Sequence, residues 1–384
     1  MPNNRLQDTY CFLGMPIHAL TAQQTLSYID VSASERDVCF LSTPNVNFFS
    51  SSLQDSAFLE SLIVSDLNVV DGAPLVWLGR RLGIPIPERV AGASLLEALV
   101  MGARLSGRKS PFKLFFFGGD GDVGSKACDL INARVIKCDG VADVICAGYL
   151  NPGVGTVEEL STQQIIKRIN LSGADFLVVS LGAVKGQAWI LRNLQHLNVP
   201  VVSHLGAAIN FISGDVPRAP RWVQRLSCEW LWRIKEQPKL FARYWHDGIL
   251  LLRVIVTRLV PYWFWIRRHR LLANEPLSFE QKRSVNTHSI CLCGALSVNS
   301  VSQLSSILSQ LKAFSGLIEL DMSRVCYADP RGLGWLMDLE KLAHAAGGTV
   351  VISQCNKELV RVLQWNHLGR LFVTPDHCVS KDFL

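Results

Sequence analysis

The 384-residue chain contains no CxxC pair and no even set of cysteines of the kind that indicates a zinc site or a disulfide framework. Its eleven cysteines are an odd count, and they lie in apolar surroundings such as Val38-Cys39-Phe40. This usage is typical of reduced thiols. The N-terminus also lacks a basic segment followed by a long apolar run, so we expect no secretory signal and a protein on the cytosolic side.

Charged residues are sparse, at 18% of the chain against 49% hydrophobic residues, which excludes intrinsic disorder and leaves room for two or three domains. The net charge of +6 is not evenly spread. Residues 214–270 hold twelve Lys and Arg against four acids, together with six of the ten tryptophans. The rest of the chain is therefore slightly acidic.

Cations beside tryptophans and aliphatic residues are typical of a segment that binds a membrane surface with anionic headgroups. A solvated basic face beside a buried helix is the alternative. Nucleic acid also accepts basic, aromatic segments, but the aliphatics between Ile249 and Val260 have no role on a polyanion, so we expect no nucleic-acid partner.

The apolar run at 248–266 is just long enough to span a bilayer. Arg253 and Arg258 would each cost about 3 kcal/mol at mid-membrane, and we expect Pro261 to interrupt the helix. We therefore predict a peripheral helix that lies in the interface on the cytoplasmic face of the membrane, with spanning as the minority alternative.

Short β-rich runs that lead into helical patterns predict an α/β fold with a doubly wound, Rossmann-like parallel sheet. The predicted strands are 38–42, 67–70, 112–117, 176–181 and 200–204. A small C-terminal α/β domain is predicted from strands at 290–296, 317–322 and 349–353. We divide the chain into a sheet domain at 1–210, a basic Trp-rich appendage at 211–271, a linker at 272–284 and a C-terminal domain at 285–384.

Polar side chains follow the predicted strands, at the sheet edge where ligands bind. Thr43 and Asn45 follow the first strand, and Asp71 follows the second. Asp71 with Gly72 behind it is a suitable general base on an accessible turn, and Arg89 could meet phosphate. Each also has a structural interpretation, namely a helix cap for Thr43 and Asn45, an Asx turn for Asp71 and a surface position for Arg89.

Residues 119–124 (GDGDVG) form a GxGxxG pattern after a strand, with Asp139 twenty residues beyond the first glycine, as in dinucleotide-binding turns. Two carboxylates inside the turn would repel a pyrophosphate, so a nicotinamide-dependent enzyme is the runner-up function. Asp120 and Asp122 also form a DxD that could hold a metal on a nucleotide-sugar diphosphate. Helix capping explains the pair more simply, and we expect no metal site and no cofactor.

Taken in order, the segments resemble the WecG/TagA/CpsF glycosyltransferase family over about residues 10–246. The matching motifs are TPNVNF at 43–48, VVDGAPLVW at 69–77, RVAG at 89–92, FFFGG at 115–119, LGAVKGQAW at 181–189, HLGAAINFISGDVPRAPRW at 204–222, EWLWR at 229–233 and RYW at 243–245. The resemblance implies an inverting, membrane-associated enzyme that moves a sugar from a UDP-sugar to a polyprenyl (undecaprenyl) diphosphate-linked sugar, in surface polysaccharide or teichoic acid linkage-unit synthesis. It identifies neither sugar.

The resemblance also implies roles for residues at the sheet edge. Asp71 becomes the catalytic base, with Thr43 and Asn45 beside it in the sugar pocket, and Arg89 steadies the departing diphosphate. Gln187 is implied to contact the donor from a loop after strand 176–181, and the donor set also includes Gly118 and Gly119.

The chain departs from the family pattern around Gln187. Val184 replaces a proline, Gly186 precedes the glutamine, and Ala188 stands where an acid is expected. This puts donor preference or the geometry of the loop in question.

For the acceptor phosphates the resemblance implies Arg218, Arg233, Lys239 and Arg243. Leu240 falls where another arginine is usual, and the adjacent Lys239 offers a point charge instead of a bidentate fork.

The C-terminal hundred residues resemble a STAS domain, through the segments 316–339 and 347–355. In that family a phosphorylatable serine often follows the aspartate of a D-S-x-G-L loop. Here Pro330 follows Asp329, which excludes a phosphorylation switch at that position. The resemblance implies an interaction or assembly role, with a protein partner or a homo-oligomer. It also leaves open a scaffold protein with a vestigial transferase half.

Overall fold

A computed structural model describes most of the chain. The described residues are 8–101, 110–137, 144–206, 208–216, 219–220, 223, 229–236, 238–312 and 314–371. They form two compact units, each assembled from separate stretches of sequence. The first unit holds His18–Leu78 and Pro85–Leu250, and the second holds Gln7–Ile17, Gly79–Ile84 and Leu251–Leu384.

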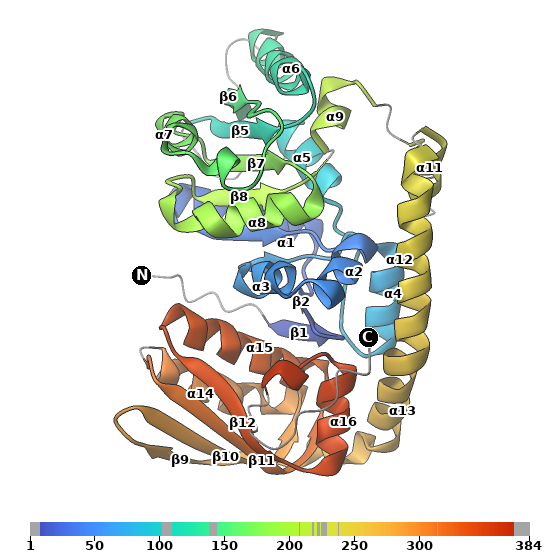
Figure 1. The fold of residues 1–384 in the computed structure, drawn as a ribbon, viewed down its shortest axis with the longest axis vertical. Coiled ribbons are helices and arrows are strands. Elements are labelled where there is room, and N and C mark those ends of the chain that lie inside the picture. Colours follow the sequence, from blue (N-terminus) through green and yellow to red (C-terminus); the bar gives the residue numbers. More distant parts are fainter. Residues whose placement is uncertain are drawn as a thin grey trace. The chain divides into compact units, whose positions relative to one another are not determined.

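A six-stranded parallel sheet lies at the centre of the first unit, in the order β4-β3-β8-β7-β5-β6 (Figure 1). The strands are β3 (Cys39–Ser42), β4 (Leu67–Asn68), β5 (Phe112–Gly118), β6 (Val144–Leu150), β7 (Phe176–Ser180) and β8 (Val201–His204). The predicted parallel sheet is confirmed. Because all six strands are parallel, their carboxyl ends meet at one edge.

Helices cover both faces of this sheet, so it is doubly wound (Figure 1). On one face, Leu41 and Leu114 pack with apolar residues of α1 (Ala22–Glu35), α5 (Gly92–Val100), α6 (Val123–Lys137) and α9 (Ala208–Ser213). On the other, Phe40 and Phe117 pack with α7 (Gln163–Leu171) and α8 (Ala183–Asn193). Successive strand residues alternate between the two cores, as the pleat requires.

Three further helices join the first unit near the ends of β3 and β4. They are α2 (Val46–Gln54), α3 (Ser56–Val64) and α4 (Ala73–Arg81), the last of which runs into the second unit. Asn45 caps α2 by accepting a hydrogen bond from the Phe48 backbone N–H at 3.1 Å. Asn47 donates to the buried carboxylate of Asp247 at 3.2 Å, which fastens α2 to α12 (Phe241–Val254).

The basic segment contains α11 (Glu229–Glu236) and a helix that is continuous from Pro238 to Arg268. The expected interruption at Pro261 is wrong. A π-helical turn at Ile255–Leu259 joins α12 to α13 (Val260–Arg268), and the Val260 N–H bonds to the Ile255 carbonyl. In an ordinary helix, proline lacks the N–H that would bond to the carbonyl four residues earlier, and its ring clashes with that carbonyl. The wider π-helical turn before Pro261 changes which backbone groups bond to each other, so the helix continues past the proline.

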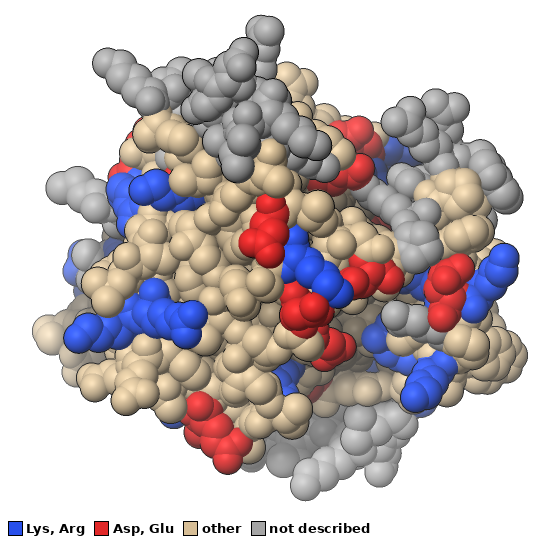
Figure 2. Space-filling view, turned by 90° about the horizontal axis from the view of Figure 1, so that it is seen from above, with Lys and Arg blue, Asp and Glu red and all other residues tan. Residues whose placement is uncertain are grey.

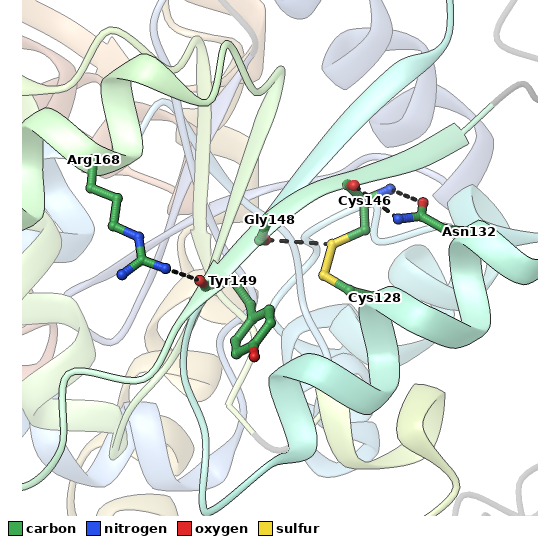
Figure 3. The surroundings of a disulfide bond; sticks show 6 residues. All are labelled: Cys128, Asn132, Cys146, Gly148, Tyr149 and Arg168. Carbon is green, nitrogen blue, oxygen red and sulfur yellow. Dashed lines mark hydrogen bonds between the residues drawn. A yellow bond between two sulfur atoms is a disulfide. The ribbon is translucent and has the colours of Figure 1, made fainter.

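Within the part of the chain that the structure describes, one pair of cysteines forms a disulfide, contrary to the expectation of reduced thiols. Cys128 of α6 and Cys146 of β6 are bonded, with their Cα atoms 5.1 Å apart (Figure 3). The Asn132 side chain brackets Cys146, because it accepts from the Cys146 N–H at 2.9 Å and donates to its carbonyl at 3.2 Å. The cross-link ties α6 to the strand that it covers.

The second unit contains a four-stranded sheet in the order β12-β11-β10-β9. Its elements are β9 (Ser278–Arg283), β10 (Thr287–Leu296), α14 (Val301–Leu311), β11 (Leu317–Ala328), α15 (Pro330–Ala345), β12 (Thr349–Cys355) and α16 (Lys357–Trp365). Strand β9 pairs antiparallel with β10 and lies inside the segment expected to be a linker, which is a correction. Its residues SFEQKR show no apolar alternation, so ladder hydrogen bonds to β10 define this edge strand.

The first described residues, up to Ile17, belong to the second unit. Strands β1 (Thr9–Phe12) and β2 (Met15–His18) form a hairpin, and β1 packs on α15. At Gly334 of α15, a β-carbon would lie 2.0 Å from the Thr9 carbonyl oxygen, so the strand backbone lies directly on the helix. Thr9 donates its hydroxyl to Asp338 at 2.5 Å.

Arg331, in the STAS-like loop, lies under this hairpin. Its guanidinium is 5% exposed and donates to the Thr9 carbonyl at 3.2 Å and to Asp8 at 2.9 Å. Before it, Asp329 caps α15 by accepting from the Arg331 and Gly332 N–H groups, and Pro330 occupies the first turn. Asp329 and Pro330 therefore form the beginning of α15, and residue 330 has no hydroxyl that could be phosphorylated.

Candidate active site

The predicted base lies where β3 and β4 end. The Asp71 N–H donates to the Pro44 carbonyl at 2.8 Å, which holds the chain after β4 against the chain after β3. Gly72 packs against Asn45, with 3.3 Å from its β-carbon position to the Asn45 Cα. The Thr43 hydroxyl packs on Gly92, whose backbone N–H donates to the Asp71 carboxylate. Thr43, Asn45 and Asp71 therefore meet at one place, as predicted from the strand ends.

Burial raises the pKa of Asp71 to about 6, from an ordinary value of 3.8. Three interactions oppose this rise, namely the charges of Arg89 and Arg233 and the Gly92 N–H, while the charge of Glu229 adds to it. A carboxyl with a pKa near 6 takes up and releases protons more readily near neutral pH than an ordinary aspartate does. A general base that acts near neutral pH requires a raised pKa of this kind.

Arg89 stands beside this carboxyl and is held by an acid. Its Nη2 donates to Glu229 Oε2 at 2.6 Å, and the two side chains are 20% and 22% exposed. Arg233, one helical turn after Glu229 on α11, lies over the ring of Phe211 at 5.3 Å and interacts with Asp71 through its charge. The charges of both arginines therefore act on the Asp71 carboxyl, and guanidinium groups are suited to binding a diphosphate.

The remaining members of the predicted acceptor set are more dispersed. Lys239 and Arg243 are exposed on the helix from Pro238 to Arg268, and Arg243 lies over the Tyr244 ring at 5.3 Å. Arg218 lies outside the described residues. Among the described members of the set, Arg233 is the one that acts on Asp71.

Gln187 does not lie where the sequence predicted. It is inside α8 instead of in a loop, it is fully buried, and its Nε2 donates to Ser42 Oγ at 2.9 Å. The side chain therefore supports the end of β3, one residue before Thr43, and faces away from solvent. The expected loop is corrected to a helix that starts at Ala183 and turns this residue inward, and the donor contact stays a prediction.

The unusual Gly186 has a packing partner. A β-carbon at residue 186 would lie 2.2 Å from the His204 ring, which occupies that space at the end of β8. Nε2 of His204 lies 2.6 Å from the Leu181 carbonyl oxygen. Burial lowers the pKa of His204, so the ring is neutral and holds the turn after β7. The contact between residues 186 and 204 was not predicted, because the two residues lie in separate motifs.

The glycine-rich turn after β5 lies at the same sheet edge, three strands away from β3. Gly118, Gly119 and Gly121 have positive φ angles of 89°, 93° and 56°, which explains three of the glycines as turn residues. A β-carbon at Gly118 would lie 2.7 Å from the Ser180 carbonyl oxygen, so β5 and β7 approach closely there.

The acids of this turn have a local partner. Asp122 pairs with Lys126 at 3.1 Å, and the same lysine contacts Asp215 at 3.2 Å. Among the described residues, no three His, Cys, Asp or Glu side chains are grouped closely enough to hold a metal ion. The pairing accounts for Asp122 without a bound ion.

An apolar stripe runs along the exposed side of the helix from Pro238 to Arg268. Its members are more than a third exposed and three or four residues apart: Phe241, Trp245, Ile249, Leu252, Val256, Val260 and Phe264. The opposite side, with Val254, Leu259 and Tyr262, is buried, and the Tyr262 hydroxyl donates to the Ala328 carbonyl at 3.1 Å. The most apolar window has a mean hydropathy of 1.6 and is 17% buried, so by length and composition this helix could cross a membrane.

The face of the molecule shown in Figure 2 carries charges of both signs. Among the described residues of that face, Lys and Arg side chains are interspersed with Asp and Glu.

Comparisons with known proteins identify relatives of this chain. The chain is 24% identical over 194 residues to a Staphylococcus aureus (strain MRSA252) protein named N-acetylglucosaminyldiphosphoundecaprenol N-acetyl-beta-D-mannosaminyltransferase, covering 50% of this chain and 70% of that protein. The protein of the same name from strain MW2 is 24% identical over 215 residues, covering 56% and 79%.

The C-terminal part has its own relatives. Residues 279–374 match the family described as "Mlab, STAS domain". The solved structure of the anti-sigma factor antagonist SpoIIAA in its unphosphorylated form is 24% identical, with a TM-score of 0.22, and covers 25% of this chain and 86% of that one. Residues 10–263 match the family described as "Glycosyl transferase WecG/TagA/CpsF family". Because that match covers more than half of the chain, the protein belongs to the WecG/TagA/CpsF family of glycosyltransferases and carries a STAS domain after its transferase part.

Proposed function

We propose that this glycosyltransferase moves a sugar, with inversion, from a UDP-sugar to a polyprenyl (undecaprenyl) diphosphate-linked sugar in cell-surface polysaccharide synthesis. The observation that carries the proposal is the Asp71 carboxyl with a pKa near 6 and two arginines acting on it. The name of the Staphylococcus aureus relatives supports a lipid diphosphate-linked acceptor.

The chemistry follows from these side chains. The Asp71 carboxylate takes the proton of an acceptor hydroxyl while that oxygen attacks the anomeric carbon of the donor from the side opposite the diphosphate. The bond from the anomeric carbon to the diphosphate oxygen breaks, and UDP leaves with the bonding electrons. Arg89, with Arg233 nearby, compensates the charge that develops on the leaving group. Thr43 and Asn45 border the space for the reacting sugar.

We further infer that the exposed stripe binds the cytoplasmic membrane surface, where a lipid-linked acceptor resides. Exposed aromatic and aliphatic side chains would enter the headgroup region, and nearby cations such as Lys239, Arg243 and Arg253 would meet anionic lipid. The buried side of the same helix supports a peripheral arrangement, because Tyr262 and Leu259 belong to the core of the second unit. Spanning the bilayer would place that folded unit in hydrocarbon.

For the STAS domain we propose an interaction or assembly role. The proline at residue 330 and the cap formed by Asp329 support a role that does not depend on phosphorylation at that loop. A scaffold with a vestigial transferase half is the competing function, and the departures around Gln187 motivate it. The close packing of Gly186 on His204 weighs against a vestigial transferase half, because it keeps the turn after β7 ordered.

Transfer assays test the proposal directly. Purified protein would be mixed with a lipid acceptor, undecaprenyl-diphosphate-N-acetylglucosamine in vesicles, and a panel of UDP-sugars that begins with UDP-N-acetylmannosamine. We expect UDP formation together with a lipid product heavier by one sugar residue. UDP formation without a lipid product, or an unchanged rate in Asp71→Asn, would contradict the mechanism. A protein that transfers no sugar from the panel would favour the scaffold.

A further inference from the structure

Glu229 is an acid placed among groups whose proposed task is to bind phosphate. It is the first residue of α11, and its carboxylate contacts Arg89 at 2.6 Å. Diphosphate-binding sites are built from positive groups, and a carboxylate in such a site opposes the ligand. A partly buried acid at this position therefore needs an explanation.

The contact leaves part of the Arg89 guanidinium free. The bond to Glu229 uses Nη2, and among the described residues Nε and Nη1 of Arg89 have no hydrogen-bond partner. A guanidinium has five N–H donors in a fixed planar fork, so holding one end fixes the direction of the others. Glu229 thus orients Arg89 without using all of its donors.

The same contact positions α11. Glu229 and Arg233 are four residues apart on this helix, so they lie on the same side of it. Both interact with Asp71 through their charges, with opposite effects on its pKa. Because both residues lie on the same side of α11, the contact between Glu229 and Arg89 also places Arg233 where its charge acts on Asp71.

We propose that Glu229 is a positioning residue that fastens α11 over the Asp71 site, so that Arg89 and Arg233 together meet the diphosphates of the bound substrates. The inference rests on the proposed function for the identity of the ligand. It goes beyond that function because it assigns α11 a closing role that depends on one carboxylate. Asp71, Arg89, Glu229 and Arg233 then form a balanced set of two cations and two acids.

A first experiment needs no substrate. In Glu229→Ala the helix loses its contact with Arg89, and trypsin should cleave after Arg233 at least fivefold faster than in the parent, with an unchanged circular dichroism spectrum. Glu236→Ala is the matched control, because Glu236 is an exposed acid on the same helix. Equal cleavage rates in Glu229→Ala and the parent would overturn the proposal whether or not the protein transfers sugar.

A second experiment uses the transfer assay. Glu229→Ala should raise KM for the lipid acceptor at least tenfold with a smaller change in kcat, and Glu229→Gln should fall between this variant and the parent, because it keeps an acceptor oxygen. Both variants should move the acid limb of the pH profile to lower pH, since a negative charge near Asp71 is removed. A faster Glu229→Ala enzyme would instead identify an inhibitory latch, and an unmoved acid limb would also count against the proposal. Inactivity of the parent protein would refute the proposed function and leave the proteolysis result standing.

Discussion

Gly186 lies directly against the imidazole of His204, so closely that a β-carbon on the glycine would come within 2.2 Å of the ring. The two residues are on α8 and at the end of β8, and Nε2 of the ring contacts the carbonyl of Leu181, five residues before Gly186. The departure from the family pattern at Gly186 thus leaves the space that the His204 ring occupies. The pair sets the turn after β7 at the ligand-binding edge.

Gly186→Ala should therefore destabilise the protein. The added methyl group must displace a buried ring, and overpacking of this kind costs about 1 to 3 kcal/mol. Thermal unfolding followed by circular dichroism would measure the loss. Gly182→Ala is the control, because nothing lies within 4 Å of a β-carbon there. Adding His204→Ala should recover part of the loss, and a double variant as unstable as the sum of the single ones would show that the ring is not the obstacle.

The pH dependence of transfer should report Asp71. The base acts as a carboxylate, and burial raises its pKa to about 6 against the opposing charges of Arg89 and Arg233. We expect kcat/KM to rise about tenfold per pH unit below pH 6 and to level off above it. Asp71→Asn should lower kcat by about 10² to 10⁴-fold. A rate that stays constant from pH 5 to pH 7 would be incompatible with this assignment.

Membrane binding should depend on the exposed side of the long helix. Leu252, Val256 and Phe264 are each about 60% exposed, and burying such side chains in an apolar environment is worth about 1.5 to 3 kcal/mol each. Changing all three to serine should release the protein from anionic vesicles in flotation assays. The matched control is the pair Leu171→Ser and Val298→Ser, which changes exposed apolar residues elsewhere.

Carbonate extraction of native membranes separates the peripheral from the spanning arrangement. A peripheral helix is released at alkaline pH, and retention of the parent protein in the pellet would show that the helix spans the bilayer. Deletion of the helix is a poor substitute for these substitutions, because its other side contributes Val254, Leu259 and Tyr262 to a core.

Arg331 should be essential for the stability of the second unit. It is 5% exposed and bound to Asp8 and to the Thr9 carbonyl, and it lies 3.7 Å from Asp338. Removing one partner of a buried ion pair typically costs about 3 to 5 kcal/mol, so Arg331→Ala should lower the unfolding midpoint strongly in urea. Arg361→Ala, at an exposed arginine of the same unit, should not. Equal midpoints for the two variants would mean that the hairpin contact is not stabilising.

Much of the transferase sheet was accessible from sequence, because its strands are buried on both sides and read as continuous apolar runs. Strand β3 was expected at 38–42 and lies at Cys39–Ser42, and Asp71 could be placed because it follows such a run. Strand β9 was missed because an exposed edge strand carries no apolar pattern.

The other features that the sequence did not reveal have separate causes. The partner of Arg89 is 140 residues away, at Glu229, and no periodicity links them. Gln187 was placed in a loop because its motif follows a strand, whereas α8 begins early enough to turn it inward. Pro261 was expected to end a helix, and a π-helical turn that local sequence does not announce lets the helix continue.

The hairpin on α15 has a consequence for synthesis of the protein on the ribosome. Thr9 and Asp338, which share a hydrogen bond, are 329 residues apart, so β1 leaves the ribosome long before the helix α15 on which it packs. Contacts of such separation form slowly, and strands that stay unpaired meanwhile are prone to aggregation. A chain that ended with the transferase match, at residue 263, would lack α15, so this hairpin needs the STAS domain as its packing partner.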